Sequence, residues 1–182
     1  MHVENTSFEG LVVLTPRVFT DSRGHFFESY SLQHFENESL HFNWVQDNQS
    51  HSSYGVVRGL HFQKNPSAQT KLIRVLQGEI LDVVVDLRKD QPSYGQVYSI
   101  VLSSENKKQL LIPKGFAHGF SVLSEKADVL YKCDAFYDKQ AEAGICFNDE
   151  SLAIDWKIPA DKMIVSEKDI ILPSFENCNA GF

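Results

Sequence analysis

The sequence predicts a mainly β fold, a sandwich or a barrel built from short strands. Short apolar segments follow one another at close spacing along most of the chain, separated by Gly, Pro, Asn and Ser. The chain is also rich in aromatic residues, with 13 Phe, 6 Tyr and 2 Trp, and these residues favour strands. Few segments have the periodicity of an amphipathic helix, so we expect only a few short helices.

Length and composition indicate one globular domain that spans residues 1–182. The net charge of −7 argues against a general nucleic-acid or membrane-surface binder, so an anionic ligand would need a local cluster of cations. No apolar run approaches membrane-spanning length, and the N-terminus lacks the pattern of a signal peptide. The three cysteines are odd in number and lack metal-type spacing, so we expect a reducing, cytoplasmic location.

The N-terminal part of the chain is expected to hold two strands, a turn and one helix. Leu11–Leu14 and Phe26–Tyr30 have the composition of strands, and Asp21–Gly24 has that of a turn. Ser31 can cap a short helix over Leu32–Leu40. The polar run that follows, from residue 46 to residue 51, is unusual among strands. It indicates either a loop or one wall of a polar cavity.

The middle of the chain predicts a hairpin of two strands, Leu72–Leu76 and Ile80–Leu87, around a turn at Gln77-Gly78. One face of the second strand is fully apolar. The opposite face carries Asp82 and Asp86, which lie either on a solvated surface or in a polar pocket. Further strands are expected around Gln96–Leu102, Gln109–Ile112, Gly119–Leu123 and Ala127–Cys133. Near the C-terminus, Ser166 and Asp169 have the spacing of a capping box and predict a short helix.

The stretch Arg58–Lys71 concentrates groups able to do chemistry. Strict alternation in its first strand would place Arg58, Leu60 and Phe62 on one face, and Gly59, His61 and Gln63 on the other. A glycine beside a histidine leaves room for a ligand to approach closely. The structural alternative is a hydrogen-bonded histidine with solvated cationic neighbours.

A second informative stretch, Ile112–Phe120, contains Pro-x-Gly-x-x-His, which resembles the second of the two cupin motifs. In metal-binding cupins the first motif supplies His-x-His and a glutamate. Here the corresponding residues are His61-Phe62-Gln63, and no glutamate follows within a few residues. Two imidazoles and an amide are a poor ligand set for Zn²⁺ or Fe²⁺, so we expect no metal.

Without a metal, side chains have to carry the reaction. His61 is the natural base near neutral pH, and Asp82 or Asp169 could orient its ring. Spacing alone favours a helix-capping role for Asp169. Lys71 could stabilise an oxyanion or lie on the surface, and Tyr131 could donate a proton or pack as a half-buried strand residue.

Several strings together closely resemble the dTDP-4-dehydrorhamnose 3,5-epimerase family, in order and with similar spacing, from residue 8 to about residue 170. The strings are Asp21–Gly24, Phe26–Tyr30, Val45–Asn48, Arg58–Gln63, Ile112–Phe120 and Asn148–Glu150. The resemblance implies a cupin-type jelly-roll (double-stranded β-helix) barrel and a homodimer. It also implies cofactor-free epimerisation at C-3 and C-5 of a dTDP-linked 4-keto sugar, within dTDP-L-rhamnose synthesis.

Carried over by position, the resemblance makes His61 the general base, Asp169 its partner, Lys71 the enolate stabiliser and Tyr131 the opposing acid. It implies substrate contacts for Arg23, Glu28, Gln46, Asn48, Arg58, His118, Glu142 and Lys168. The three cations Arg23, Arg58 and Lys168 would hold the pyrophosphate.

The sequence departs modestly from the family. Phe147 stands where Trp is common, and Phe136, beside Tyr137, stands where a second Tyr is frequent. Three alternatives stay open: a mono-epimerase for a related nucleotide-linked 4-keto sugar, a catalytically silent sugar-nucleotide binder, and a metal-dependent cupin. The missing histidine at position 63 disfavours the last of these.

Overall fold

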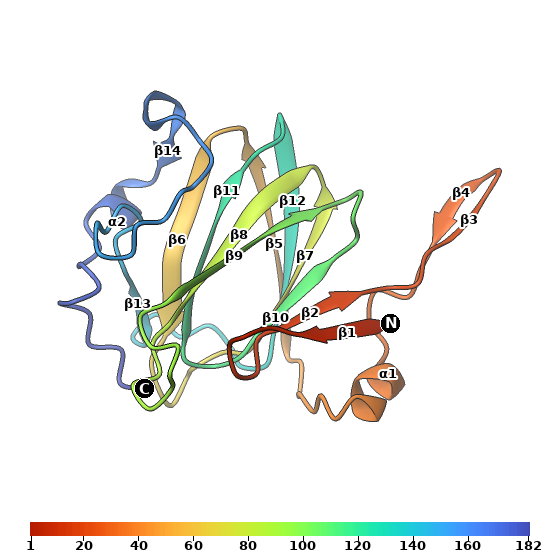
Figure 1. The fold of residues 1–182 in the computed structure, drawn as a ribbon, viewed down its shortest axis with the longest axis horizontal. Coiled ribbons are helices and arrows are strands. Elements are labelled where there is room, and N and C mark those ends of the chain that lie inside the picture. Colours follow the sequence, from red (N-terminus) through yellow and green to blue (C-terminus); the bar gives the residue numbers. More distant parts are fainter.

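The computed structural model describes residues 1–182 and contains two six-stranded sheets that face each other (Figure 1). The first sheet has the order β1 (His2–Asn5), β2 (Val12–Thr15), β10 (Gln109–Ile112), β7 (Lys71–Gln77), β12 (Lys126–Cys133) and β5 (Gln46–Ser53). The second has the order β13 (Glu142–Gly144), β6 (Val56–Gln63), β11 (Phe116–Val122), β8 (Glu79–Asp86) and β9 (Val97–Ser103). The short strand β14 (Ile164–Val165) pairs with β6 in parallel, and all other pairs are antiparallel.

The rest of the regular structure is sparse, as the sequence predicts. A separate hairpin, β3 (Phe19–Asp21) and β4 (Gly24–Phe26), projects away from the barrel, and α1 (Leu32–Asn37) follows it (Figure 1). A 3₁₀ turn (Ala160–Lys162) and α2 (Glu167–Ile170) lie near the C-terminus. No helix has the length or the apolar character needed to cross a membrane.

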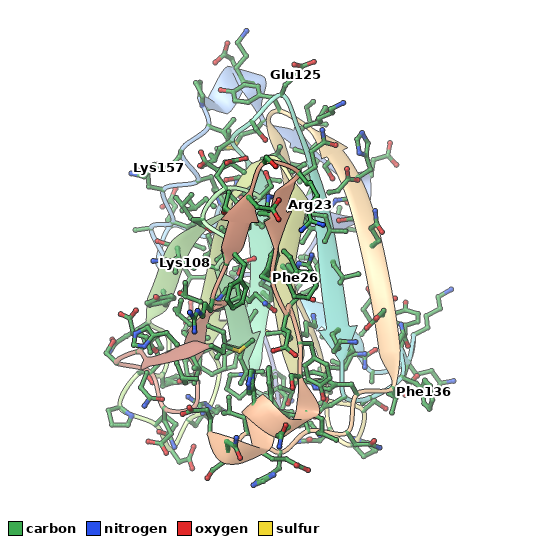
Figure 2. The ribbon with its side chains drawn as sticks, turned by 90° about the vertical axis from the view of Figure 1, so that its right-hand side faces the viewer. Arg23, Phe26, Lys108, Glu125, Phe136 and Lys157 are labelled. Atoms are coloured by element: carbon green, nitrogen blue, oxygen red, sulfur yellow. The ribbon has the colours of Figure 1, made fainter.

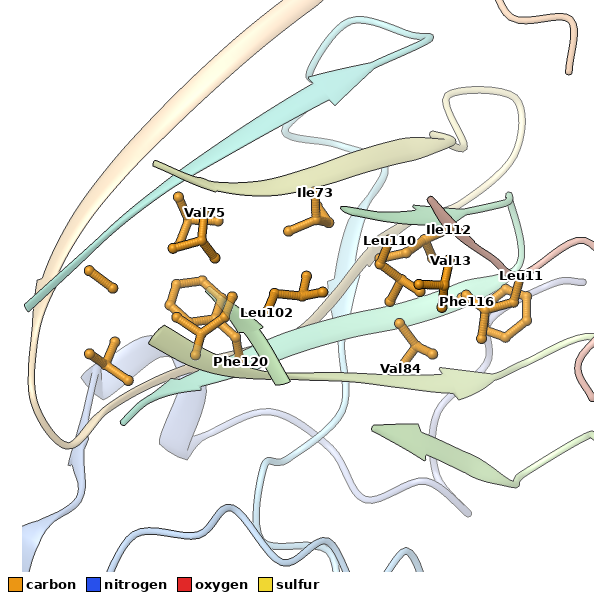
Figure 3. Close-up of a cluster of buried hydrophobic side chains, with 14 of the residues drawn as sticks. Leu11, Val13, Ile73, Val75, Val84, Leu102, Leu110, Ile112, Phe116 and Phe120 are labelled. Carbon is orange, nitrogen blue, oxygen red and sulfur yellow. The ribbon is translucent and has the colours of Figure 1, made fainter. Parts of the chain in front are cut away.

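The largest core lies between the two sheets and follows from alternation within the strands. Ile73 and Val75 point inward from the first sheet, and Val84 and Phe120 point inward from the second (Figure 3). A second apolar cluster covers the outer face of the second sheet, where the C-terminal segment contributes Trp156. The two sheets therefore form a jelly-roll barrel whose interior is packed in part by apolar side chains, in agreement with the predicted fold class.

The predicted hairpin between residues 72 and 87 is wrong. Strands β7 and β8 do follow each other through Gly78, but they belong to different sheets and do not pair. Gly78 has a φ of +79°, a conformation that L-residues rarely adopt, and here the chain crosses from one sheet to the other. Alternation still holds within β8: Ile80 and Val84 face the barrel interior, and Leu81 faces the C-terminal segment.

The polar run from residue 46 to residue 51 is a strand and not a loop. Strand β5 pairs with β12 at the edge of the first sheet, with Asn48 opposite Tyr131 and Ser50 opposite Val129. Because Val129 belongs to the core between the sheets, its neighbours on that face point inward as well. The polar residues of β5 therefore form one wall of the barrel, as one of the two sequence interpretations expected.

Candidate active site

A cavity of about 620 Å³ opens between the two sheets, and most of the predicted site residues line it. The lining includes all four predicted catalytic residues and five of the predicted substrate contacts: His61, Lys71, Tyr131, Asp169, Asn48, Arg58, His118, Glu142 and Lys168. These side chains come from β5, β6, β7, β11, β12 and β13 and from the C-terminal helix α2. The fold thus brings together residues that lie more than a hundred positions apart in the chain.

A bulge in β6 brings Arg58 and His61 to the same face. Between the pairs formed by Arg58 with Phe120 and by His61 with His118, β6 contains one more residue than β11. The strict alternation expected from the sequence is therefore broken, and Arg58 lines the cavity together with His61. Gly59 sits in the bulge with a φ of +118°, and a Cβ there would lie 2.6 Å from the Cα of Gly119. A glycine is therefore needed at position 59 because the backbones of β6 and β11 come close together there, and not because a ligand approaches it.

The carboxylate of Asp169 hydrogen-bonds both to the bulge of β6 and to the ring of His61. One carboxylate oxygen lies 2.7 Å from His61 Nε2, and the other accepts a hydrogen bond of 3.2 Å from the backbone N–H of Gly59. Its own backbone N–H donates to the hydroxyl of Ser166 at 3.1 Å. The capping role and the pairing with His61 therefore coexist, because the cap uses the backbone of Asp169 and the pairing uses its side chain.

The His61–Asp169 pair is electrostatically suited to base catalysis. Burial alone would raise the pKa of Asp169, but the hydrogen bonds that its carboxylate makes with His61 and Gly59 outweigh burial and hold the pKa below its ordinary value. The aspartate is therefore a carboxylate at neutral pH. With Nε2–H donated to this carboxylate, Nδ1 is the ring nitrogen that can accept a proton.

Tyr131 and Lys71 lie on the opposite wall, in the first sheet. Tyr131 pairs with Ile73 across β12 and β7, and Lys71 lies two residues from Ile73 along β7, opposite Cys133. Removal from water raises the pKa of the Tyr131 phenol, so the hydroxyl keeps its proton until a strong acceptor appears. Burial also lowers the pKa of Lys71, and nearby negative charge, including that of Asp82, opposes this shift.

Asp82 does not orient His61, which was one of the two possibilities raised by the sequence. Its two carboxylate oxygens lie 3.0 and 2.9 Å from Nε2 of His118 instead, and both side chains are buried. Asp82 thus lies in a polar pocket and not on a solvated face. Asp86, on the same strand, is buried against Arg88 and Ser93.

A second cluster of polar groups lies where Glu142 and Lys168 line the cavity. Lys168 Nζ lies 2.5 Å from one oxygen of Glu142, and the hydroxyl of Tyr137 donates to the other at 2.9 Å. Partial burial alone would raise the pKa of Glu142, but these two bonds hold it below its ordinary value.

Gln46 does not line the cavity: it accepts a hydrogen bond of 3.1 Å from the backbone N–H of Tyr137 and donates to Asn48. Tyr137 also lines the cavity, although sequence reasoning gave it no role and mentioned it only as the neighbour of Phe136.

Gln63 occupies the position of the second histidine in metal-binding cupins, and its amide has structural partners. Its Nε2 donates to the carbonyl oxygens of Ser67 and Phe136, at 2.6 and 3.2 Å, and its Oε1 accepts from the backbone N–H of Asp138 at 2.7 Å. The amide therefore ties two loops together. No three His, Cys, Asp or Glu side chains converge in a geometry suited to a metal ion.

Arg23 and Glu28 do not lie at the cavity of their own chain. Arg23 lies at the turn of the β3–β4 hairpin, where its side chain is 88% exposed and pairs with Asp21 (Figure 2). Glu28 follows the hairpin and lies 3.8 Å from His34.

The two positions that depart from the family pattern, Phe136 and Phe147, do not line the cavity. Phe136 is exposed, and Phe147 packs behind the second sheet.

The fold and the cavity define a cupin-type protein whose two facing walls carry the side chains of acid–base chemistry. The chain belongs to the dTDP-4-dehydrorhamnose 3,5-epimerase family, whose sequence profile matches residues 5–177. A relative from Escherichia coli (strain K12), a dTDP-4-dehydrorhamnose 3,5-epimerase, is 47% identical over 170 residues, which are 93% of this chain and 91% of the relative.

Solved structures agree with this assignment. The dTDP-4-dehydrorhamnose 3,5-epimerase from Elizabethkingia anophelis superposes with a TM-score of 0.92 at 49% identity, over 98% of each chain. The dTDP-6-deoxy-D-glucose-3,5-epimerase from Legionella pneumophila, solved in complex with dTDP-4-keto-L-rhamnose, has a TM-score of 0.92 at 42% identity. That match covers 98% of this chain and 95% of the other.

Proposed function

We propose that this chain epimerises C-3 and C-5 of dTDP-4-dehydro-6-deoxy-D-glucose and yields dTDP-4-dehydro-L-rhamnose, a step of dTDP-L-rhamnose synthesis. The observation that carries the proposal is the placement of the His61–Asp169 pair and Tyr131 on opposite walls of one cavity. Inversion of a carbon requires a base on one face of the sugar and an acid on the other. The two walls supply this pair.

The reaction begins at a C–H bond beside the C-4 ketone. His61 takes the proton through Nδ1, and the electron pair of the bond moves into the ketone to form an enolate. Asp169 stabilises the imidazolium that results and keeps the ring in place, because its carboxylate is fixed by Gly59 as well. Tyr131 then returns a proton to the carbon from the opposite face.

Lys71 stabilises the enolate. Its ammonium group lines the cavity, and no carboxylate lies within 4.0 Å of it, so its N–H groups are free to bind the enolate oxygen. A cation that is poorly solvated before the reaction interacts strongly with the negative charge that develops. Proton removal and return leave the oxidation state of the substrate unchanged, so the reaction needs no redox cofactor.

Arg58 and Lys168 supply positive charge for the pyrophosphate. Arg58 is held by Ser52 Oγ at 3.1 Å and Lys168 by Glu142, and both line the cavity. Guanidinium and ammonium groups suit phosphate oxygens. The three cysteines are unpaired, which suits a reducing compartment, and we place the protein in the cytoplasm.

Wild-type protein treated with a chelator is expected to exchange two carbon-bound hydrogens of dTDP-4-dehydro-6-deoxy-D-glucose with deuterated water. The exchange occurs because each proton taken by His61 is replaced by one drawn from solvent. NMR of the recovered sugar shows which carbons carry deuterium. Exchange at one carbon alone would favour a mono-epimerase, and no exchange by the folded protein would contradict the proposed activity.

We further propose that the protein acts as a homodimer in which the β3–β4 hairpin reaches the cavity of the partner. A two-stranded hairpin has little stability alone in water. This hairpin projects away from the barrel (Figure 1), and its Phe19 and Phe26 side chains are 52% and 69% exposed. Docking on a second copy would cover these rings. It would also bring Arg23 and Glu28 to a cavity as substrate contacts, which their own chain does not allow.

A mixed dimer tests this arrangement. His61→Ala and Arg23→Ala are each expected to be weakly active alone. When the two chains are co-expressed, each heterodimer contains one cavity with both wild-type residues. About a quarter of all cavities are then intact for random pairing, because half of the dimers are mixed. Recovery of about a quarter of the wild-type kcat supports the shared site, whereas recovery no greater than the sum of the two homodimers would contradict it.

A further inference from the structure

The phenol of Tyr131 has one side-chain hydrogen-bond partner, the hydroxyl of Ser50. The two oxygens are 3.0 Å apart, and either one can donate. Ser50 lies on β5, the edge strand of the first sheet, and is half-buried. It does not line the cavity, so it touches Tyr131 without touching the space for the sugar. None of the roles described above uses this serine.

A count of protons shows that Tyr131 needs such a partner. In one epimerisation a C–H bond breaks and its proton goes to His61 Nδ1. A new C–H bond forms on the other face with the proton of Tyr131. The sugar is neutral again, but the enzyme now holds an imidazolium and a tyrosinate. A second epimerisation of the same bound sugar requires a neutral imidazole and a phenol, so His61 has to lose a proton and Tyr131 has to gain one.

The two residues differ in their access to water. The side chain of His61 is 32% exposed, so its imidazolium can release a proton directly to solvent. Tyr131 sits between β7 and β5 in the sheet, with its ring against His118 and Phe120. Burial raises the pKa of this phenol, so a tyrosinate formed here binds a proton strongly. The route by which the proton arrives is therefore the remaining question.

We propose that Ser50 is the proton-relay residue that restores Tyr131 between the two epimerisations of one bound sugar. A hydroxyl group donates one hydrogen bond and accepts others at the same time. Ser50 Oγ–H gives its proton to the tyrosinate oxygen as Ser50 Oγ takes a proton from water at the edge of the sheet. Atoms and charges balance through bulk solvent: the water that gives its proton to Ser50 becomes hydroxide, and the proton that His61 releases to solvent neutralises it. This inference rests on the proposed double epimerisation.

The position of Arg58 fits the same step. Its guanidinium Nε donates to Ser52 Oγ at 3.1 Å, and a terminal nitrogen donates to the carbonyl oxygen of His51 at 3.4 Å, so the cation binds β5 within two residues of Ser50. The positive charge favours the transient tyrosinate. It does not supply the proton, because a guanidinium stays protonated in proteins. Ser50 is the neutral group in contact that can pass a proton on.

The test is the ratio of singly to doubly epimerised sugar released in the first turnovers. In Ser50→Ala the first epimerisation is expected to proceed at close to the wild-type rate, because Tyr131 starts with its proton. The second is slowed, so the fraction released after a single epimerisation rises by about 10-fold or more, as for loss of a proton-transfer group. Ser50→Thr keeps the hydroxyl and is expected to restore the wild-type ratio. Ser53→Ala removes an exposed serine of the same strand and serves as the matched control.

A role in orienting the phenol would give a different result. Loss of orientation slows both epimerisations alike, so an unchanged ratio in folded Ser50→Ala would overturn the relay. Small acids in the buffer, such as ammonium, are expected to restore double epimerisation in Ser50→Ala without changing the wild-type ratio. If Ser50→Ala does not fold, Ser50→Val, which has the shape of the threonine variant without its hydroxyl, should still raise the ratio, and an unchanged ratio would count against the relay. Wild-type exchange at one carbon alone would instead overturn the double epimerisation itself.

Discussion

Replacing His61 with alanine is expected to abolish exchange at both C-3 and C-5. The reason is that the other basic groups on this wall already have partners: His118 is bound to Asp82, and Glu142 is bound to Lys168 and Tyr137. Asp169, the partner of His61, points at no other side chain that could replace the imidazole. General base catalysis contributes about 10²- to 10⁴-fold, so kcat/KM should fall by about this factor. Deuterium content at each carbon, followed by NMR against time, measures the two losses separately.

The variant should still fold, because the half-buried ring of His61 is not part of an apolar core cluster. Asp169 would keep its bond to Gly59 and so preserve the bulge of β6. His41→Ala removes an exposed histidine and serves as the control, with activity close to wild type. Persistent exchange at one carbon in His61→Ala would mean that a different base serves that carbon.

Alternation within single strands was predictable, but the assignment of strands to sheets was not. Period-two patterning correctly predicted that Leu81 and Asp82 lie on opposite faces of β8, because side chains of a strand alternate whatever its neighbours are. The same pattern carries no information on which sheet a strand joins. The chain therefore passes from β7 to β8 through Gly78 in a way that looks like a hairpin in sequence but is a crossing between sheets.

Local irregularity also limited the prediction of the site. Arg58 and His61 share a face only because one extra residue at Gly59 breaks the alternation of β6. A glycine in a strand is consistent with a bulge or with room for a ligand, and the contact with Gly119 that decides between them is a tertiary one. Asp169 shows the same limit. Its spacing from Ser166 favoured the helix cap and left Asp82 and Asp169 as alternative partners of His61, and only the family resemblance chose Asp169.

The positions of Arg23 and Glu28 in a single chain do not fit the substrate contacts that the family resemblance implies for them. The resemblance implied that both contact the substrate, yet both lie beyond the cavity of their own chain. Hydrophobic patterning and residue spacing describe one chain, so they cannot predict which residues would reach the cavity of a second copy. Exposed aromatic rings on a hairpin that projects from the barrel are the observation on which the proposed homodimer rests.

Tyr131→Phe is expected to separate exchange from inversion. His61 and Lys71 remain in this variant, so the C–H proton is still removed and the enolate still forms. The imidazolium exchanges its proton with deuterated water, because the His61 side chain is 32% exposed, and it can return deuterium to the same face of the sugar. Without the phenol, no acid protonates the opposite face. Deuterium should thus enter the substrate with retained configuration.

The expected magnitudes make this separation measurable. Inversion should fall by about 10²-fold or more, the usual loss for a general acid, and exchange into unreacted substrate should fall by less than about 10-fold. The loss of one hydroxyl is tolerable for the fold, since its partner Ser50 is half-buried at the sheet edge and can bond to water. Tyr54→Phe, at an exposed tyrosine between β5 and β6, is the control. Equal losses of exchange and inversion in Tyr131→Phe would mean that the phenol assists proton removal, for example by binding the enolate oxygen. In that case the acid on the opposite face would have to be another group of the first sheet.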